Sequence, residues 1–180
     1  MSRRSMHVLC AALASCALAD APAGAATERV VYSFQGGSDG ARPYTGPINV
    51  DGTLYGATYL GGANGAGTIY SVTFAGVETV LHAFTGGGDG AYPWSSLIHL
   101  NGKLYGTASG GGANGLGLMF AMSKAGAETP VYSFTGGGDG IEPLGRPIAV
   151  GGTLYGTTYA GGGYTCYQND GCGTVFSVQP

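Results

Sequence analysis

The carboxylates that recur most regularly lie in a loop that occurs three times, Gly-Gly-x-Asp-Gly-x-x-Pro, with aspartates Asp39, Asp89 and Asp139. Three such loops could offer oxygen ligands to Ca²⁺, but this ion takes about six to eight oxygens and each loop holds a single carboxylate. A simpler interpretation is that each aspartate accepts hydrogen bonds from its own turn, while neighbouring glycines supply positive φ angles. We therefore predict structural turns here, with no metal and no cofactor.

Catalytic groups do not form a recognisable constellation in the sequence. The first loop has the letters of a G-x-S-x-G nucleophile elbow around Ser38, but that motif needs a strand, a sharp turn and a helix. His82 and His99 each occur in one repeat alone. Glu78 and Glu128 follow expected hairpin turns, so we predict that their side chains are solvated and do not form the acid pair of a glycosidase. We expect a protein that is not an enzyme, with a hydrolase as the least favoured function.

A ligand surface is more plausible at the loop positions where the three copies differ. Just after each Asp-Gly pair, one position holds Arg42, Tyr92 or Glu142 and another holds Tyr44, Trp94 or Leu144. Exposed aromatic rings there could stack on a sugar or anchor a protein partner. The candidate ligand surface is therefore Arg42, Tyr44, Tyr92, Trp94 and Glu142. The alternative is that these side chains only pack between neighbouring repeats.

The elements that position these loops belong to a repeat of about 50 residues, as the spacing of Phe34, Phe84 and Phe134 shows. In the first copy, strand-like runs cover 47–50, 53–59, 68–73 and 79–84. Pairs such as Asp51-Gly52 between the runs are typical of two-residue hairpin turns. Both faces of the runs are apolar or small, which indicates strands covered on both sides.

The repeats predict an all-β, β-propeller-like fold of three four-stranded units, at about 35–84, 85–134 and 135–180. Residues 30–34 match the last strand of a unit, and the third unit has only three strand-like runs. We predict that 30–34 complete this third unit. Propellers generally have about four to eight blades, so a homodimer forming a six-bladed ring, an open β-repeat arc and a β-trefoil remain alternatives.

The composition excludes several classes of protein. The chain has 180 residues, of which 37 are Gly, while 44% are hydrophobic and only 9% are charged. This is too apolar for a disordered chain and too rich in glycine for long helices. The formal net charge of −3 argues against nucleic acid as a partner.

The N-terminus predicts export. Residues 1–26 combine two arginines, an apolar run of about a dozen residues and a stretch of small residues, which are the parts of a signal peptide. Residues 27–180 then form a single β-repeat domain. Leu13-Ala-Ser-Cys16 also resembles a lipoprotein processing site, so Cys16 is a candidate for lipidation and the protein would meet a membrane only through that anchor. The expected location is the periplasm, the outer surface or the medium.

Cys166 and Cys172 flank an insertion in the third repeat, at about residues 164–169. Because an exported protein meets an oxidising compartment, we predict a disulfide between them that closes the enlarged loop.

Three segments carry a resemblance to a known family: Leu154-Tyr-Gly-Thr-Thr158, Val131-Tyr-Ser-Phe-Thr-Gly-Gly-Gly-Asp-Gly140 and Gly173-Thr-Val-Phe176. They resemble the GloVer (Gloeobacter–Verrucomicrobia) tandem repeat of exported bacterial proteins, and the second repeat departs from it at Leu118, where threonine is lost. The resemblance implies a propeller-like exported protein and supplies no catalytic residues. We expect a scaffold or binding module at the cell envelope, with a carbohydrate-binding, lectin-like domain as the alternative.

Overall fold

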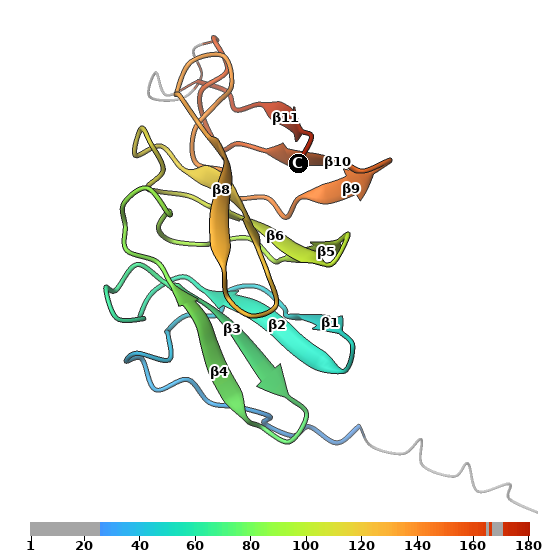
Figure 1. The fold of residues 1–180 in the computed structure, drawn as a ribbon. Coiled ribbons are helices and arrows are strands. Elements are labelled where there is room, and N and C mark those ends of the chain that lie inside the picture. Colours follow the sequence, from blue (N-terminus) through green and yellow to red (C-terminus); the bar gives the residue numbers. More distant parts are fainter. Residues whose placement is uncertain (1–25, 165, 167–170) are drawn as a thin grey trace, which may run out of the picture.

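A computed structural model describes residues 26–164, 166 and 171–180. Its strands form three antiparallel sheets that follow one another in chain order from one end of the molecule to the other (Figure 1). The first sheet contains β1 (Ile48–Val50), β2 (Thr53–Thr58), β3 (Thr68–Thr73) and β4 (Glu78–Ala83). The second contains β5 (Ile98–Leu100), β6 (Lys103–Ala108), β7 (Leu118–Met122) and β8 (Glu128–Ser133). The third contains β9 (Ile148–Val150), β10 (Thr153–Thr157) and β11 (Val175–Val178).

Each repeat thus forms a sheet of its own, as the blades of a propeller do, and the predicted all-β, propeller-like class is confirmed. The sheets do not close into a ring: the first and the third lie at opposite ends of the described chain (Figure 1). The predicted strands of the first repeat agree with the observed ones to within a residue or so at each end. No helix in the described residues is long and apolar enough to cross a membrane.

The first hairpin of each sheet has the predicted tight turn. Asp51 and Gly52 have φ angles of 51° and 80°, and Asn101 and Gly102 have nearly the same values, 50° and 79°. Two consecutive positive φ angles define the primed turn whose twist matches that of antiparallel strands. The turn sets the register, with Val50 opposite Thr53 in the first sheet.

Aromatic rings join each repeat to the next sheet. Phe84, which follows β4, meets Phe120 of the second sheet edge to face, with 5.4 Å between ring centroids. The matching ring after β8, Phe134, meets Phe176 of the third sheet at 5.0 Å. Phe84 and Phe134 are fully buried, and such ring pairs contribute about 0.5–1.5 kcal/mol beyond the burial of their area. The regular spacing of the phenylalanines is therefore the spacing of the contacts between sheets.

Glycine permits a second contact between repeats. Gly67 has a φ of 97°, and a Cβ atom built on it would lie 2.6 Å from Cδ of Pro93 in the next repeat. Gly117 and Pro143 repeat this arrangement at the same distance. The glycine and proline of the sequence pattern are thus contact partners across the repeat boundary.

The prediction that residues 30–34 complete the third repeat is wrong for the single chain. These residues lie beside the first sheet, where Phe34 packs on Tyr70 with ring centroids 4.8 Å apart. They form no strand, and the third sheet has the order β11-β10-β9. The physical reason is distance: the first and third sheets are at opposite ends of the stack (Figure 1).

The predicted disulfide is confirmed: Cys166 and Cys172 are bonded, with their Cα atoms 5.1 Å apart. At the base of this loop, Gly173 donates its N–H to the carbonyl of Gly161 at 3.0 Å, as the equivalent Gly67 donates to Gly61 in the first repeat. The base of the loop is therefore the same although the third loop is longer. The predicted signal peptide up to residue 25, with Cys16, lies outside the described residues.

Candidate ligand-binding site

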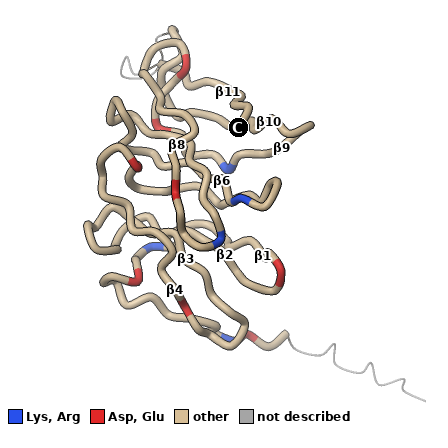
Figure 2. The backbone as a smooth tube through the Cα atoms, in the orientation of Figure 1, with Lys and Arg blue, Asp and Glu red and all other residues tan. Residues whose placement is uncertain are grey.

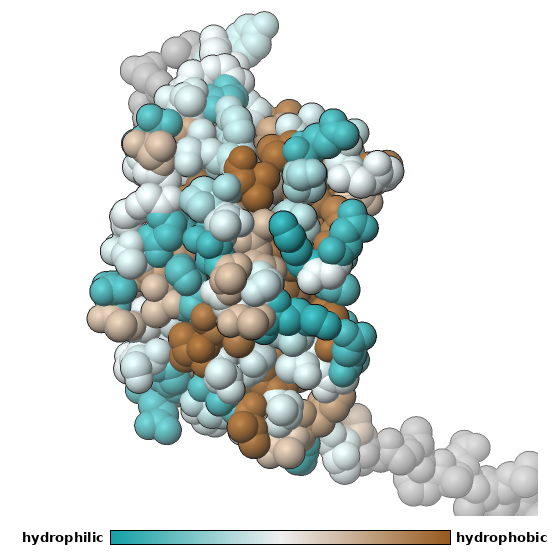
Figure 3. Space-filling view, viewed as in Figure 1, coloured by the Kyte–Doolittle hydropathy of each residue, from teal (hydrophilic) through white to brown (hydrophobic). Residues whose placement is uncertain are grey.

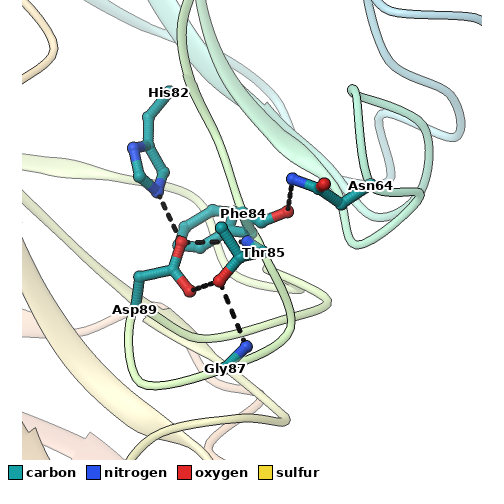
Figure 4. A network of polar contacts seen from close by, with 6 residues as sticks. All are labelled: Asn64, His82, Phe84, Thr85, Gly87 and Asp89. Carbon is teal, nitrogen blue, oxygen red and sulfur yellow. Dashed lines mark hydrogen bonds and ion pairs between the residues drawn. The ribbon is translucent and has the colours of Figure 1, made fainter.

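The repeated aspartates serve their own turns, as predicted. Asp89 accepts hydrogen bonds from the backbone N–H of Thr85 (2.9 Å) and from the Thr85 hydroxyl, and its carboxylate meets Nε2 of His82 at 3.1 Å (Figure 4). Burial acts to raise the pKa of Asp89, but the bonds from Thr85 and His82 outweigh it and the pKa lies below its ordinary value. The aspartate is therefore an ionised acceptor that holds its loop in place.

The sequence indicates that His82 is a variation found in one repeat alone. In the structure, however, His82 takes part in a contact with the loop aspartate that all three repeats make. Tyr32 donates its hydroxyl to Asp39 at 3.0 Å, and Tyr132 donates to Asp139 at 2.7 Å. His82 stands at the equivalent position and meets Asp89. The position thus requires a side chain that can donate to the aspartate, which both tyrosine and histidine can do.

The predicted solvation of Glu78 and Glu128 is wrong, because each has one buried carboxylate oxygen. Among the described residues, neither Oε1 atom has a hydrogen-bond partner. Burial, and next the charge of Asp89, raise the pKa of Glu128 to about 7. Burial and the charge of Asp39 raise the pKa of Glu78 as well. The two lie on different sheets, at the first residues of β4 and β8.

The variable loop position has a strained backbone in all three repeats. Arg42, Tyr92 and Glu142 have φ angles of 59°, 57° and 53°, a region that L residues with side chains seldom adopt. Hydrogen bonds to the preceding repeat hold two of them: Tyr92 donates its N–H to the carbonyl of Ala66 (2.8 Å), and Glu142 to that of Leu116 (3.0 Å). The side chains at this position are therefore presented by a fixed backbone.

Four aromatic rings, Tyr44, Tyr59, Tyr92 and Trp94, form a continuous cluster on these loops, which we call the aromatic platform. Tyr44 and Trp94 lie 4.7 Å apart between centroids, and Tyr59 lies 4.9 Å from Trp94 and 5.3 Å from Tyr92. Tyr44, Tyr92 and Trp94 are exposed, while Tyr59 is half-buried among them. The structure thus brings together three of the residues predicted for the ligand surface.

A groove of about 390 Å³ adjoins the platform, between the loops of the second and third repeats. Tyr92 and Trp94 form one side, and Glu142 and Leu144 line it from the third repeat. Ser109, which lines the groove, stands at the sequence position equivalent to Tyr59. The smaller side chain leaves open the space that a tyrosine occupies between the first two repeats.

The predicted and observed site residues differ at two points. Arg42 is exposed and is not among the residues that line the groove; its carbonyl accepts the N–H of Tyr59 at 3.1 Å. Tyr59 was missed because it lies at the end of an expected strand rather than in a loop. Its signal in the sequence is the variation Tyr59, Ser109, Tyr159 at one repeat position.

The charges around this site are few. Figure 2 shows that acidic and basic residues are spread thinly over the three sheets and their loops. On the face seen in Figure 3, apolar side chains occur in separate patches between polar ones. Among the described residues that line the groove, Glu142 is the one with a charged side chain. An acidic group beside aromatic rings suits an uncharged or cationic ligand with hydrogen-bond donors.

Three stacked sheets with recurrent aromatic contacts and variable loops define a β-repeat protein of propeller-like form. The chain matches the model of the Gloeobacter/Verrucomicrobia repeat over residues 20–180, and it belongs to this family. No curated protein matches the chain in sequence.

Proposed function

We propose that this protein is an exported, non-enzymatic binding module of the cell envelope and that its ligand is a neutral carbohydrate. The observation that carries the proposal is the aromatic platform, which exposes Tyr44, Tyr92 and Trp94 beside a groove. Exposed aromatic rings offer a ligand a large apolar contact area. The disulfide and the signal-like N-terminus support a location outside the cytoplasm.

The shape and chemistry of the site favour a sugar over an anionic ligand. The C–H-rich face of a pyranose can lie on Trp94 or Tyr92, while its hydroxyl groups donate to the carboxylate of Glu142 across the groove. A phosphate, a sulfate or a uronic acid would be repelled by that carboxylate. The rings are also held before the ligand arrives, because they touch one another and their loops are bonded to the preceding repeat. Such preorganisation lowers the entropic cost of binding.

The test is titration of the protein with a panel of neutral oligosaccharides. Trp94 is the single tryptophan of the chain, so its fluorescence reports directly on the site in the unmodified protein, and titration calorimetry measures the affinity of every variant. We expect Trp94→Ala to weaken binding at least tenfold, in the range found for aromatic anchors of binding sites. Phe74→Ala is the matched control, because Phe74 is an exposed aromatic residue that does not line the groove.

Two results would overturn the carbohydrate proposal. One is that no neutral glycan in a broad array binds above background. The other is that Trp94→Ala and Phe74→Ala retain the same affinity as the unmodified protein. Glu142→Gln separates the two parts of the argument: it should weaken binding of neutral sugars while reducing the discrimination against uronic acids.

A further inference from the structure

The far end of the sheet stack, at the third sheet, exposes an apolar surface that is buried inside the stack, and the near end, at the first sheet, holds an apolar cavity. At the far end, Val150, Tyr155 and Val175 are 59%, 38% and 80% exposed. Their counterparts in the first repeat, Val50, Tyr55 and Ile69, are 6%, 8% and 0% exposed, because the second sheet covers them. The third sheet therefore exposes the face with which each of the first two sheets packs against the next sheet.

The near end of the stack is the first sheet, and it presents the other of the two surfaces that meet when one sheet packs on the next. Within the stack, Val50, Tyr55 and Ile69 share one core cluster with Leu104 and Met122 of the second sheet. In the first sheet the counterparts of Leu104 and Met122 are Leu54 and Val72, and they line an apolar cavity of about 370 Å³. Leu54 is half-buried, whereas Leu104 is fully buried. The first sheet thus lacks the preceding sheet that the other two sheets have.

Residues 28–34 form an unpaired segment at this near end. They correspond in sequence to β4 and β8, and Phe34 packs on Tyr70 as Phe84 packs on Phe120. Within the described chain, no backbone–backbone hydrogen bond joins residues 28–34 to another segment. At the far end, β11 pairs only with β10, so its outer edge is also free among the described residues. An edge strand with free N–H and C=O groups is a template for another chain.

We propose that a second copy of this chain occupies both ends. Residues 28–34 of one copy add to β11 of the other as the fourth strand, and the exposed face of each third sheet packs on the first sheet of the partner copy. The contact is heterologous, since it joins two different surfaces. Two copies related by a twofold axis form it twice and close six sheets into a ring, which lies within the range of about four to eight blades for propellers.

The internal repeats fix the register of the new pairing. In the first sheet Ser71 lies opposite Thr79, and in the second Ala121 lies opposite Thr129. The equivalent residues at the junction are Ser177 of β11 and Arg29 of the second copy. The structure therefore predicts which pair of side chains must meet if the two copies join as consecutive repeats do.

The first experiment measures the mass of the purified protein by light scattering. We expect twice the mass of one chain of the purified protein, which is at most 17.9 kDa when residues 1–26 are retained. Val175→Asp should give a single-chain mass, because it places a charge at the centre of the proposed contact; Val175 is 80% exposed in the single chain, so the fold itself loses no packing. Ala113→Asp is the control: it adds the same charge to an exposed loop of the middle repeat and should leave the double mass unchanged.

The second experiment tests the register. Arg29→Cys and Ser177→Cys are prepared as separate variants, mixed and oxidised, and the products are separated on a non-reducing gel. Covalent dimers should form in the mixture and not in either variant alone. A single-chain mass at all concentrations would overturn the proposal, as would a dimer that Val175→Asp does not disrupt. Assemblies larger than two chains would overturn the closed ring. Neither experiment involves a sugar, so the result is independent of the carbohydrate proposal.

Discussion

Replacing Glu128 by glutamine should stabilise the protein at neutral and alkaline pH and should have little effect in acid. Glu128 begins β8, and its Oε1 atom is buried without a hydrogen-bond partner among the described residues. Burial, followed by the charge of Asp89, raises its pKa from 4.5 to about 7. A carboxyl group with a raised pKa keeps its proton in the folded state at pH values where the unfolded chain has released it. The folded state is therefore favoured by protonation, and this stabilisation is complete below about pH 4.5 and lost as the pH rises through 7.

The size of the effect follows from the shift. One pKa unit corresponds to about 1.36 kcal/mol, so the interval from 4.5 to about 7 sets an upper limit of about 3 kcal/mol. Because Glu128 is only partly buried, water screens its charge, and we expect about 1–2 kcal/mol in practice. The glutamine of the Glu128→Gln variant has no charge at any pH, so the variant does not lose stability as the pH rises through 7. The variant should match the unmodified protein near pH 4.5 and exceed its free energy of unfolding by that amount at pH 8.

Urea unfolding at fixed protein concentration, followed by circular dichroism at the two pH values, measures this difference. Glu142→Gln removes the same charge from an exposed side chain, and its free energy of unfolding should follow that of the unmodified protein at both pH values. Equal pH dependence for the Glu128→Gln variant and the unmodified protein would refute the reasoning, because it would mean that the carboxylate is well solvated in the folded state.

Two further predictions concern the contacts of the fold, and thermal or urea unfolding checks both. Gly67→Ala should cost more than 2 kcal/mol, because a Cβ there would lie 2.5 Å from the carbonyl oxygen of Thr58 and 2.6 Å from Cδ of Pro93, at a φ of 97°. Gly65→Ala, with φ 74° and no atom within 4 Å, should cost only about 1–2 kcal/mol. Equal losses would contradict this steric argument. Thr58→Ala should cost about 1–3 kcal/mol, because it leaves the hydroxyl of Thr68, 2.8 Å away, without its buried partner. The double change Thr58→Ala/Thr68→Leu should recover part of that loss, since it recreates the pair found in the second repeat; strictly additive losses would show that the two hydroxyls do not depend on each other.

The strands and their turns could be predicted from the sequence because local chemistry decides them. Asp51-Gly52 and its equivalents adopt positive φ angles whatever lies beyond the hairpin, and the repeated aspartates find their donors within their own loops. The loss of threonine at Leu118 also has a local explanation, because Ala108 replaces the matching threonine across the sheet.

The features that were not predicted depend on neighbouring repeats. Residues 30–34 have the composition of a fourth strand, but nothing in that composition distinguishes the third sheet of the same chain from that of another copy. The raised pKa of Glu128 depends on its burial and on the charge of Asp89 in the preceding loop, and a hairpin turn gives no sign of either. Tyr59 joins the aromatic platform only because the loops of two repeats meet beside the end of β2.

The hydrogen bond at the base of the disulfide loop has a practical consequence. Gly173 bonds to Gly161 as Gly67 bonds to Gly61, although extra residues lie between the two partners. The chain between these partners can therefore change in length without moving the strands on either side. This position is suited to receive a foreign peptide, such as an epitope or a tag, displayed at the edge of an otherwise unaltered sheet.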